Sequence, residues 1–401
     1  MNVTVIGQGY VGLTLAVFAA DHFNVVGFDN NPLLVAQLNA GMSHIEGISK
    51  TKLKELIGKR KYRATTDARH LSDSDIVLIA VPTPLDINRD PDLKFIDSAC
   101  KTIGENVSKR ILIINESTSY PGTLRDFIKP RVEKYSVNKI AHLYAVSPER
   151  VDPGREDFNQ KNTPRLYSGL TKEASQLTAN FYASFCDNLV EVSSPEVAET
   201  AKLFENTFRQ VNIALVNELA QITHAIGVDV FETLNAANTK PYGFMKFMPS
   251  AGVGGHCIPV DPTYLASVAE NSGVPATFIR RANEVNRSMS TYVVDRVEKD
   301  FGGSLTGKRI LIIGVSYKSN ISDCRETPAE LVIDELRKRG ASVSWHDEIV
   351  KSWRGEKSTP LSPADICIVL TRHATVMEQS ILKVSPYVFD TTGTVNGAIH
   401  L

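Results

Sequence analysis

The chain has 401 residues, with 44 basic and 45 acidic side chains and a formal net charge of −1. This length favours two or three domains, and the balanced charge excludes a large basic field of the kind that binds nucleic acid. No apolar run reaches the roughly 18 residues that a transmembrane helix needs. The N-terminus leads straight into a strand-like segment without a signal peptide, so we expect a cytoplasmic protein without a membrane partner.

The first motif is a glycine-rich turn between a short strand and a helix. Strand Val3–Ile6 is followed by Gly7-Gln-Gly-Tyr-Val-Gly12, a helical apolar pattern and a second strand, Val25–Phe28, that ends at Asp29. The glycines permit a tight turn and the approach of a pyrophosphate to the helix N-terminus. Asp29 is placed to accept hydrogen bonds from both ribose hydroxyls and to repel a 2′-phosphate. The motif therefore predicts NAD binding rather than NADP binding.

Further apolar strands and helical segments alternate after this motif. The expected strands are Ile76–Val81, Ile111–Asn115 and Leu143–Val146, and the expected helices lie near Leu33–Leu38, Lys50–Ile57 and Ile96–Val107. The alternation predicts a parallel sheet with helices on both faces, with ligands beyond the carboxyl ends of the strands. Thr83, Thr118 and Glu149 follow three such strands and are candidates to meet the cofactor or a water. Ordinary turn chemistry at strand ends is the alternative.

One long helix is expected from Pro195 to about Ile226, with Gly227 as its stop. Its recurring apolar positions predict a stripe that faces the core; they are Val197, Ala201, Phe204, Phe208, Val211, Leu215 and Leu219. Lys202, Asn206 and Arg209 share one neighbouring face, which is either solvated or part of a site. At ~32 residues the helix would be ~48 Å long, so we expect it to bridge two domains and to offer a dimer surface.

Cys257 lies in the segment Gly252-Val-Gly-Gly-His-Cys-Ile-Pro-Val-Asp-Pro262, which reads as a glycine-rich loop. Such a loop allows a close approach to a ligand, and a cysteine there is a nucleophile if its thiolate is favoured and accessible. A small buried apolar thiol is the alternative. If the polar face of the long helix borders this loop, Lys202 is a candidate base or charge stabiliser and Asn206 a candidate oxyanion donor. The five cysteines include no C-x-x-C pair, which indicates neither a disulfide framework nor a metal site.

The C-terminal part repeats the strand–helix–strand–acid order. Strand Lys308–Ile313 ends at Gly314, a helix covers about Pro328–Lys338, and strand Ser342–Trp345 leads to Asp347. Gly314 is followed by Val-Ser-Tyr-Lys, so the G-x-G-x-x-G pattern is missing. Further strands are expected at Ile366–Leu370 and Tyr387–Asp390. We infer a second, degenerate dinucleotide-type fold for a different nucleotide, with Lys318 and Arg325 near its phosphates.

The predicted fold class is thus α/β, with two Rossmann-like doubly wound parallel-sheet domains joined by a long central helix. The expected domains are 1–192 for NAD, 193–300 for the long helix and the cysteine loop, and 301–401 for the second nucleotide.

The chain resembles the UDP-glucose/GDP-mannose dehydrogenase family along its whole length. The matching segments are Gly7–Gly12, Val81–Pro84, Glu116–Thr118, Ser147–Gly154, Lys202–Asn206, Gly252–Asp261 and Tyr317–Pro328. The resemblance implies an oxidation of the C6 hydroxyl of a sugar nucleotide to a carboxylate with two NAD⁺ in succession. It implies that Cys257 traps the C6 aldehyde as a thiohemiacetal, which is oxidised to a thioester and released by water.

The same resemblance implies a role for each matching residue. The implied catalytic residues are Cys257, Lys202, Asn206, Asp261, Thr118 and Glu149. The implied NAD contacts are Gly7, Gly9, Tyr10, Val11, Gly12, Asp29, Asn30, Thr83, Thr118 and Arg325. The implied contacts of the UDP-sugar substrate are Arg150, Val151, Lys202, Asn206, Arg209, Tyr242, Gly254, Tyr317 and Lys318. A homodimer through the central helix is implied as well.

Three departures from the UDP-glucose enzymes narrow the expected substrate. The sequence has Ser147-Pro-Glu-Arg-Val-Asp-Pro-Gly154, Val260 directly before the aspartate, and His256 before the cysteine. These features resemble the branch that acts on UDP-N-acetylhexosamines, which serves polysaccharide or surface glycan synthesis; UDP-glucose is the alternative substrate. Two other functions remain as alternatives, a two-electron hydroxyacid dehydrogenase and a non-catalytic NAD-binding sensor. Neither explains Cys257, and the strand–helix–strand repeat after residue 308 also weighs against the first.

Overall fold

The structure is a computed structural model that describes the chain except for residues 46, 152–156 and 256. His256 and residues 152–154 of the predicted site segment therefore lie outside the described residues. The chain divides into two compact units, Met1–Glu205 and Asn206–Leu401, each with a sheet of its own.

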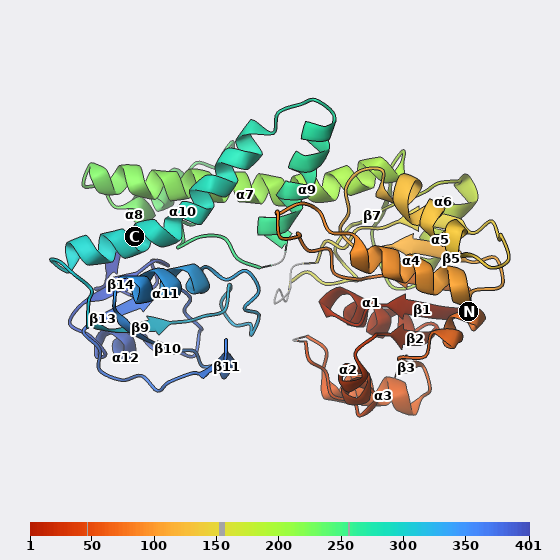
Figure 1. The fold of residues 1–401 in the computed structure, drawn as a ribbon, viewed down its shortest axis with the longest axis horizontal. Coiled ribbons are helices and arrows are strands. Elements are labelled where there is room, and N and C mark those ends of the chain that lie inside the picture. Colours follow the sequence, from red (N-terminus) through yellow and green to blue (C-terminus); the bar gives the residue numbers. More distant parts are fainter. Residues whose placement is uncertain (46, 152–156, 256) are drawn as a thin grey trace. The chain divides into compact units, whose positions relative to one another are not determined.

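The first unit is built on an eight-stranded sheet with the order β3-β2-β1-β4-β5-β6-β7-β8 (Figure 1). The strands are β1 (Asn2–Ile6), β2 (Asn24–Phe28), β3 (Tyr62–Thr65), β4 (Ile76–Ile79), β5 (Leu112–Asn115), β6 (Leu143–Val146), β7 (Arg165–Gly169) and β8 (Leu189–Glu191). Strands β1 to β6 are parallel, and β7 pairs with β6 in the antiparallel direction. The order β3-β2-β1-β4-β5-β6 is that of a Rossmann fold.

Helices cover both faces of this sheet, as the alternating sequence pattern predicts. They are α1 (Tyr10–Ala20), α2 (Pro32–Asn39), α3 (Lys50–Gly58), α4 (Lys94–Asn106), α5 (Lys129–Tyr135) and α6 (Lys172–Tyr182). One apolar core joins the sheet to α1, α3 and α6, and a second joins its other face to α4 and α5. The central strands β4, β5 and β6 are therefore buried on both sides, which explains their nearly continuous apolar sequence, whereas Arg63 of β3 is exposed.

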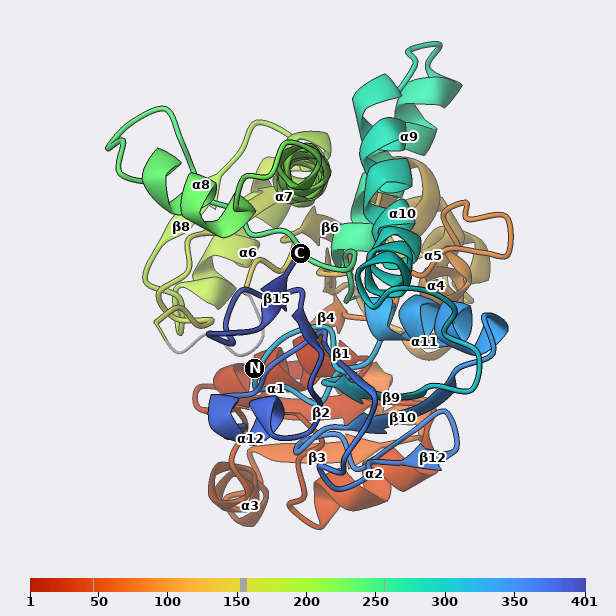
Figure 2. The same cartoon turned by 90° about the vertical axis from the view of Figure 1, so that its left-hand side faces the viewer.

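The second unit contains a five-stranded parallel sheet with the order β10-β9-β13-β14-β15. Its strands are β9 (Arg309–Ile313), β10 (Ser342–His346), β13 (Ile366–Val369), β14 (Val388–Asp390) and β15 (Ile399–His400), and a hairpin joins β11 (Ser352–Trp353) to β12 (Glu356–Lys357). Its helices are α8 (Val230–Ala237), α9 (Cys257–Asn271), α10 (Thr277–Asp300), α11 (Pro328–Lys338) and α12 (Glu378–Leu382). Figure 2 shows α10 running beside both α9 and α11. The predicted second Rossmann-like fold is confirmed.

The long helix α7 covers Pro195–Ala225, close to its predicted bounds. The prediction of its buried face, however, is wrong. Val197, Phe204, Phe208 and Leu215 are 44%, 60%, 40% and 63% exposed, whereas Asn206, Gln210 and Asn217 are buried. These polar side chains are accommodated because each finds a buried or half-buried partner, respectively Asp261, Asn283 and Asn286.

The predicted loop around Cys257 also differs from the structure. Cys257 is the first residue of α9, and Asp261 and Pro262 lie inside that helix. Pro259 lies in the first turn of α9, where proline is tolerated because the N–H groups there have no intrahelical acceptor, whereas Pro262 lies beyond that turn inside the helix. The sequence signal was misleading here because two prolines close to glycines usually mark a turn. Among the described residues, no helix is both long enough and apolar enough to cross a membrane.

Candidate active site

The glycine-rich turn after β1 is shaped by close packing at two of its three glycines. A Cβ atom on Gly7 would lie 2.3 Å from the Ala80 carbonyl oxygen, and one on Gly12 would lie 1.9 Å from that of Gly7. Gly7 also has a φ of +89°, which only glycine adopts readily. The Cβ direction of Gly9, by contrast, meets nothing within 4 Å. This position is therefore open for the approach of a ligand to the N-terminus of α1, as a bound pyrophosphate requires.

Asp29 lies at the carboxyl end of β2 and faces this turn. Its Oδ2 accepts a hydrogen bond of 2.8 Å from the Gln8 N–H, and its Oδ1 accepts one of 2.9 Å from the Asn31 N–H. A carboxylate has about four acceptor positions, so two remain for the hydroxyls of a ribose. The predicted dinucleotide contacts Gly9 and Asn30 flank the same turn and strand end. This arrangement fits NAD, the cofactor predicted from the sequence.

Thr83 and Thr118 follow β4 and β5, whose carboxyl ends lie at one edge of the parallel sheet. Thr83 is 2% exposed, and Thr118 is half-buried. Between them, the Ser117 hydroxyl accepts a hydrogen bond of 2.8 Å from the Val81 N–H and so ties the two strand ends together. The turn after Thr118 is held by Glu199 of α7, which accepts hydrogen bonds from the N–H groups of Gly122 (2.7 Å) and Leu124 (3.0 Å).

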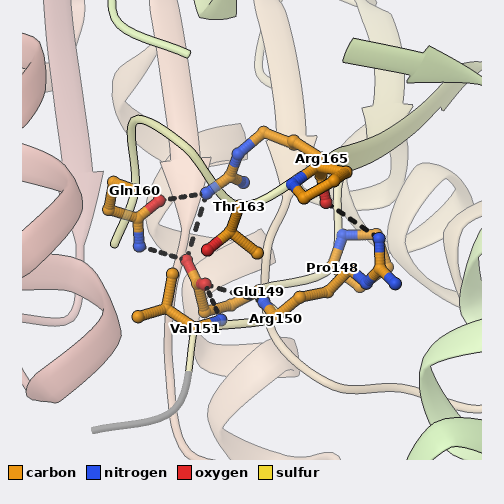
Figure 3. Close-up of a pocket in the computed structure, with 8 residues that line it drawn as sticks. Pro148, Glu149, Arg150, Val151, Gln160, Thr163 and Arg165 are labelled. Atoms are coloured by element: carbon orange, nitrogen blue, oxygen red, sulfur yellow. Dashed lines mark hydrogen bonds and ion pairs between the residues drawn. The ribbon is translucent and has the colours of Figure 1, made fainter. Parts of the chain in front are cut away.

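Glu149, after β6, is held by donors from several directions (Figure 3). Its Oε1 accepts from the N–H groups of Arg150 (2.7 Å) and Val151 (2.6 Å). Its Oε2 accepts from Gln160 Nε2 and, at 3.1 Å, from Arg165 Nη2. Burial raises the pKa of Glu149, but Arg165, Gln160, the Val151 N–H and the Lys202 ammonium outweigh burial and lower it below its ordinary value. Glu149 is therefore a carboxylate at neutral pH.

A small cavity of about 10 Å³ lies against Glu149, Val151, Gln160 and Arg165. Thr163 also lines it, and the Thr163 hydroxyl oxygen has no hydrogen-bond partner among the described residues. A cavity of this size is close to the minimum for one water molecule, and its walls offer polar partners. Such a water would satisfy the Thr163 hydroxyl.

Arg150 points away from the Glu149 carboxylate and toward α7. Its guanidinium forms an ion pair of 2.6 Å with Glu205 and donates a hydrogen bond of 2.8 Å to the Pro164 carbonyl oxygen. Because Glu205 lies one turn from Lys202 on α7, the predicted substrate contacts Arg150, Val151 and Lys202 gather in one region of the first unit.

The remaining predicted catalytic and substrate-binding residues, including Cys257, lie in the second unit. The side chain of Cys257 is exposed, whereas Cys100, Cys186 and Cys367 are buried. A thiolate is stabilised at the N-terminus of a helix such as α9. The glycines before it pack closely on Tyr317, because a Cβ atom on Gly254 would lie 2.6 Å from the Tyr317 Cβ and one on Gly255 would lie 2.9 Å from its ring. Gly254 and Tyr317 therefore lie in contact directly before the helix that begins with Cys257.

Arg325 contributes a positive charge next to this cysteine. The Gly255 N–H donates a hydrogen bond of 2.9 Å to the Arg325 carbonyl oxygen. Burial lowers the pKa of Arg325, but its bidentate pairing with Asp323, together with Cys257, raises it above the ordinary value. Arg325 and Cys257 therefore interact electrostatically.

Asn206 and Asp261 are also brought together. Asn206 Nδ2 donates a hydrogen bond of 2.6 Å to Asp261 Oδ2, and both side chains are buried. Asp261 lies one turn after Cys257 on α9, so this bond ties α7 to the helix that carries the cysteine. The structure does not bring Arg209 and Tyr242 into such a cluster: Arg209 is exposed and Tyr242 is 72% exposed.

Asp347 follows β10 in the second Rossmann-like fold as Asp29 follows β2 in the first, but its hydrogen bonding is different. Asp347 is 2% exposed and accepts hydrogen bonds from the N–H groups of Val315 (2.9 Å), Ile349 (2.9 Å) and Val350 (2.8 Å). His373 Nε2 donates a fourth, of 2.9 Å, because its Nδ1 accepts from the Asn320 N–H. Burial raises the pKa of Asp347, but these donors outweigh it and lower the pKa to about 2. No acceptor position is left for a ribose, which explains why this fold need not bind a dinucleotide in the manner of the first.

Sequence reasoning missed the partners that hold the predicted residues in place. These are Gln160, Arg165, Tyr182, Glu199 and Glu205. No motif surrounds them, and a charged residue beside an apolar run normally indicates a surface position. Arg165, for example, is the first residue of β7 and is nevertheless buried.

Comparisons with known proteins show the family to which the chain belongs. Models of the UDP-glucose/GDP-mannose dehydrogenase family match residues 1–186 (NAD binding domain), 196–288 (central domain) and 311–397 (UDP binding domain). Protein CapL of Staphylococcus aureus is 33% identical over 98% of this chain and 96% of its own length. A UDP-N-acetyl-D-glucosamine 6-dehydrogenase of Pseudomonas aeruginosa is 35% identical over 88% of this chain and 84% of its own. The solved UDP-D-ManNAc dehydrogenase of Pyrococcus horikoshii has a TM-score of 0.90, with 31% identity over 100% of this chain and 98% of its own.

Proposed function

Because the chain belongs to the UDP-glucose/GDP-mannose dehydrogenase family and is an NAD-dependent nucleotide-sugar dehydrogenase, we propose that it oxidises C6 of a UDP-N-acetylhexosamine to the carboxylate. The observation that carries this proposal is the exposed Cys257 at the N-terminus of α9, next to Arg325 and the Asn206–Asp261 pair. In a four-electron oxidation at one carbon, a thiolate holds the aldehyde covalently between the two oxidations. The product would serve polysaccharide or surface glycan synthesis.

The NAD-binding residues are those of the first Rossmann fold. Gly7 and Gly12 allow the tight turn, Gly9 leaves room for the pyrophosphate, Asp29 holds the ribose, and Thr83 and Thr118 line the carboxyl edge of the sheet. Bound NAD⁺ supplies the hydride acceptor for both oxidations.

In the proposed mechanism Cys257 adds to the C6 aldehyde through its sulfur and so forms a thiohemiacetal. Lys202 and Asn206 stabilise the oxyanion that develops on the former carbonyl oxygen. After the second oxidation Cys257 carries the sugar as a thioester. Water, handled by Asp261 and Thr118 with help from Glu149, adds to this thioester, and the C–S bond breaks to release the acid and the free thiol.

The preference for an N-acetylated sugar rests on the segment around Arg150 and on the relatives. The relatives compared above include proteins named for UDP-N-acetyl-D-glucosamine and UDP-D-ManNAc, and the ion pair with Glu205 holds the Arg150 guanidinium near Lys202. In this proposal Arg150, Val151, Arg209, Tyr242, Gly254, Tyr317 and Lys318 contact the UDP-sugar.

NADH yield per limiting sugar nucleotide tests the proposed function. UDP-N-acetylglucosamine, UDP-N-acetylmannosamine, UDP-N-acetylgalactosamine and UDP-glucose would be assayed in parallel, each with excess NAD⁺. Two NADH per sugar from one N-acetylated substrate is the expected result. One NADH per sugar would point to a two-electron alcohol dehydrogenase without a covalent step. Two NADH per sugar from UDP-glucose alone would show that the substrate is UDP-glucose and not an N-acetylated sugar nucleotide.

We also infer a homodimer through α7 and a division into domains at 1–192, 193–300 and 301–401. The exposed apolar side chains of Phe204, Phe208 and Leu215 on α7 support the dimer, because an apolar stripe on a helix is a common contact surface. The bounds of the three family models support the domain division.

A further inference from the structure

A buried charge cluster in the first unit links Glu149 to two residues, Arg165 and Glu116, that have no role in the mechanism proposed above. Arg165, whose side chain is 4% exposed, contacts the fully buried carboxylate of Glu116 at 2.8 Å and that of Glu149 at 3.1 Å. Glu116 directly follows β5, Glu149 follows β6, and Arg165 begins β7. One guanidinium therefore joins the ends of neighbouring strands, at the edge where Thr118 and Arg150 lie.

The two carboxylates differ in how they are satisfied. Glu149 has four donors, two of them backbone N–H groups. Glu116 interacts with Arg165 and with the hydroxyl of Tyr182, which lies on α6. Burial raises the pKa of Glu116 to about 7, with Arg165 opposing and Glu149 adding to this shift. Glu116 is thus the carboxyl group that takes up a proton, and Glu149 stays ionised.

Four hydrogen-bond donors keep a carboxylate ionised, and the carboxylate in turn fixes the positions of the groups that donate to it. Glu149 fixes the N–H groups of Arg150 and Val151, and these set the direction in which the Arg150 side chain leaves the backbone. The Arg150 guanidinium then meets Glu205 on α7. A chain of contacts therefore runs from Glu116 through Arg165 and Glu149 to Arg150 (Figure 3 shows its part from Arg165 onward).

We propose that Arg165 is a positioning residue: by bridging Glu116 and Glu149 it fixes the turn of Glu149–Val151 and thereby places Arg150 for the sugar nucleotide. The inference rests on the proposed function, since it assigns the turn to substrate binding and to release of the acid. The planar guanidinium of Arg165 donates to both carboxylates in a fixed geometry. A lysine ammonium does not reproduce this geometry.

The test compares Arg165→Lys and Glu116→Gln with the matched control Arg110→Met. Arg110 precedes β5 and forms an exposed bidentate pair with Glu173, at 3.0 and 2.7 Å. The first measurement is hydrogen exchange at the amides of Arg150 and Val151. The second is kcat and KM for the sugar nucleotide at saturating NAD⁺, together with KM for NAD⁺.

The expected result for Arg165→Lys is faster exchange at both amides and a loss in kcat/KM for the sugar nucleotide of roughly 10- to 100-fold. KM for NAD⁺ should stay unchanged, and Arg110→Met should match the wild type throughout. Wild-type exchange and kinetics in Arg165→Lys would overturn the proposal. Faster exchange with unchanged kinetics would also overturn it, because Arg165 would then be structural only.

Two other results are possible, and each has its own test. If Arg165→Lys does not fold, Glu116→Gln decides, since it keeps the side-chain shape and is expected to change exchange and kcat/KM in the same direction. If the wild type makes no NADH from any sugar nucleotide, the proposed function fails on its own. Calorimetric binding of UDP-N-acetylglucosamine then decides between Arg165→Lys and Arg110→Met: weaker binding to Arg165→Lys supports the positioning role, and equal binding overturns it.

Discussion

Asn206 donates a hydrogen bond of 2.6 Å to Asp261, and this buried bond joins α7 to the first turns of the helix that begins with Cys257. A buried carboxylate that loses a donor costs about 1–3 kcal/mol or more. Asn206→Ala should therefore lower the free energy of unfolding by about that amount, measured by urea denaturation, and should lower kcat as well. Asn212→Ala, on the same helix and bonded only to the Phe208 carbonyl among the described residues, is the control. Equal stability of the two variants would contradict the importance of the Asn206–Asp261 bond.

Cys257→Ser should abolish formation of the acid while leaving NAD binding unchanged, because a serine hydroxyl lacks the nucleophilicity of a thiolate. Product analysis by mass spectrometry and a separate NAD titration would measure the two effects. Cys324→Ser is the control, since Cys324 is half-buried and not fully buried like Cys100, Cys186 and Cys367. Full turnover to the acid in Cys257→Ser would rule out the covalent mechanism.

Asp29→Ser should weaken NAD binding and relax the discrimination against NADP. A hydrogen bond to a charged acceptor contributes about 1.5–3 kcal/mol, so the Kd for NAD is expected to rise by about tenfold or more. Asp21→Asn, in which the aspartate lies at the C-terminus of α1 and pairs with Lys52 at the surface, should leave both affinities unchanged. An unaltered cofactor preference in Asp29→Ser would remove Asp29 from the ribose site.

The raised pKa of Glu116 leads us to expect a specific pH dependence of the free energy of unfolding. Burial raises its folded-state pKa from 4.5 to about 7, so the folded state binds the proton more tightly than the unfolded state. Stability should therefore fall as pH rises from about 4.5 to 7, by up to roughly 3 kcal/mol. Relative to the wild type, Glu116→Gln should gain stability between pH 5 and pH 8, as measured by urea denaturation at both values. A stability difference that is the same at both pH values would contradict this assignment.

We expect a charge among the exposed apolar side chains of α7 (Phe204, Phe208 and Leu215) to disrupt the proposed dimer. Leu215 is 63% exposed, and Leu215→Glu should convert the proposed dimer to a monomer in light scattering, because a carboxylate would have to be buried in the contact. Leu33→Glu, at a position on α2 that is 75% exposed, is the control. A dimer that survives Leu215→Glu would place the contact elsewhere.

The sequence alone predicted the elements whose signals are local. The strand before Gly7, the glycine spacing and Asp29 were sufficient for the first Rossmann fold, because a tight turn needs particular residues at fixed positions. Likewise, Pro195 and Gly227 bracketed the long helix to within a residue or so. The apolar run Ile310–Ile313 and the strand–helix–strand–acid order that ends at Asp347 revealed the second sheet.

The tertiary structure alone decided which partners those elements meet. Helical periodicity defines the faces of α7 but not which one is buried, and the buried face carries Asn206, Gln210 and Asn217 because other helices supply hydrogen-bond partners. The same holds for Arg165, which joins Glu116 and Glu149 across 49 and 16 positions of sequence. Such pairs depend on long-range contacts, and no local pattern encodes them, because the cost of burying a charge is offset only where the fold brings its partner within reach.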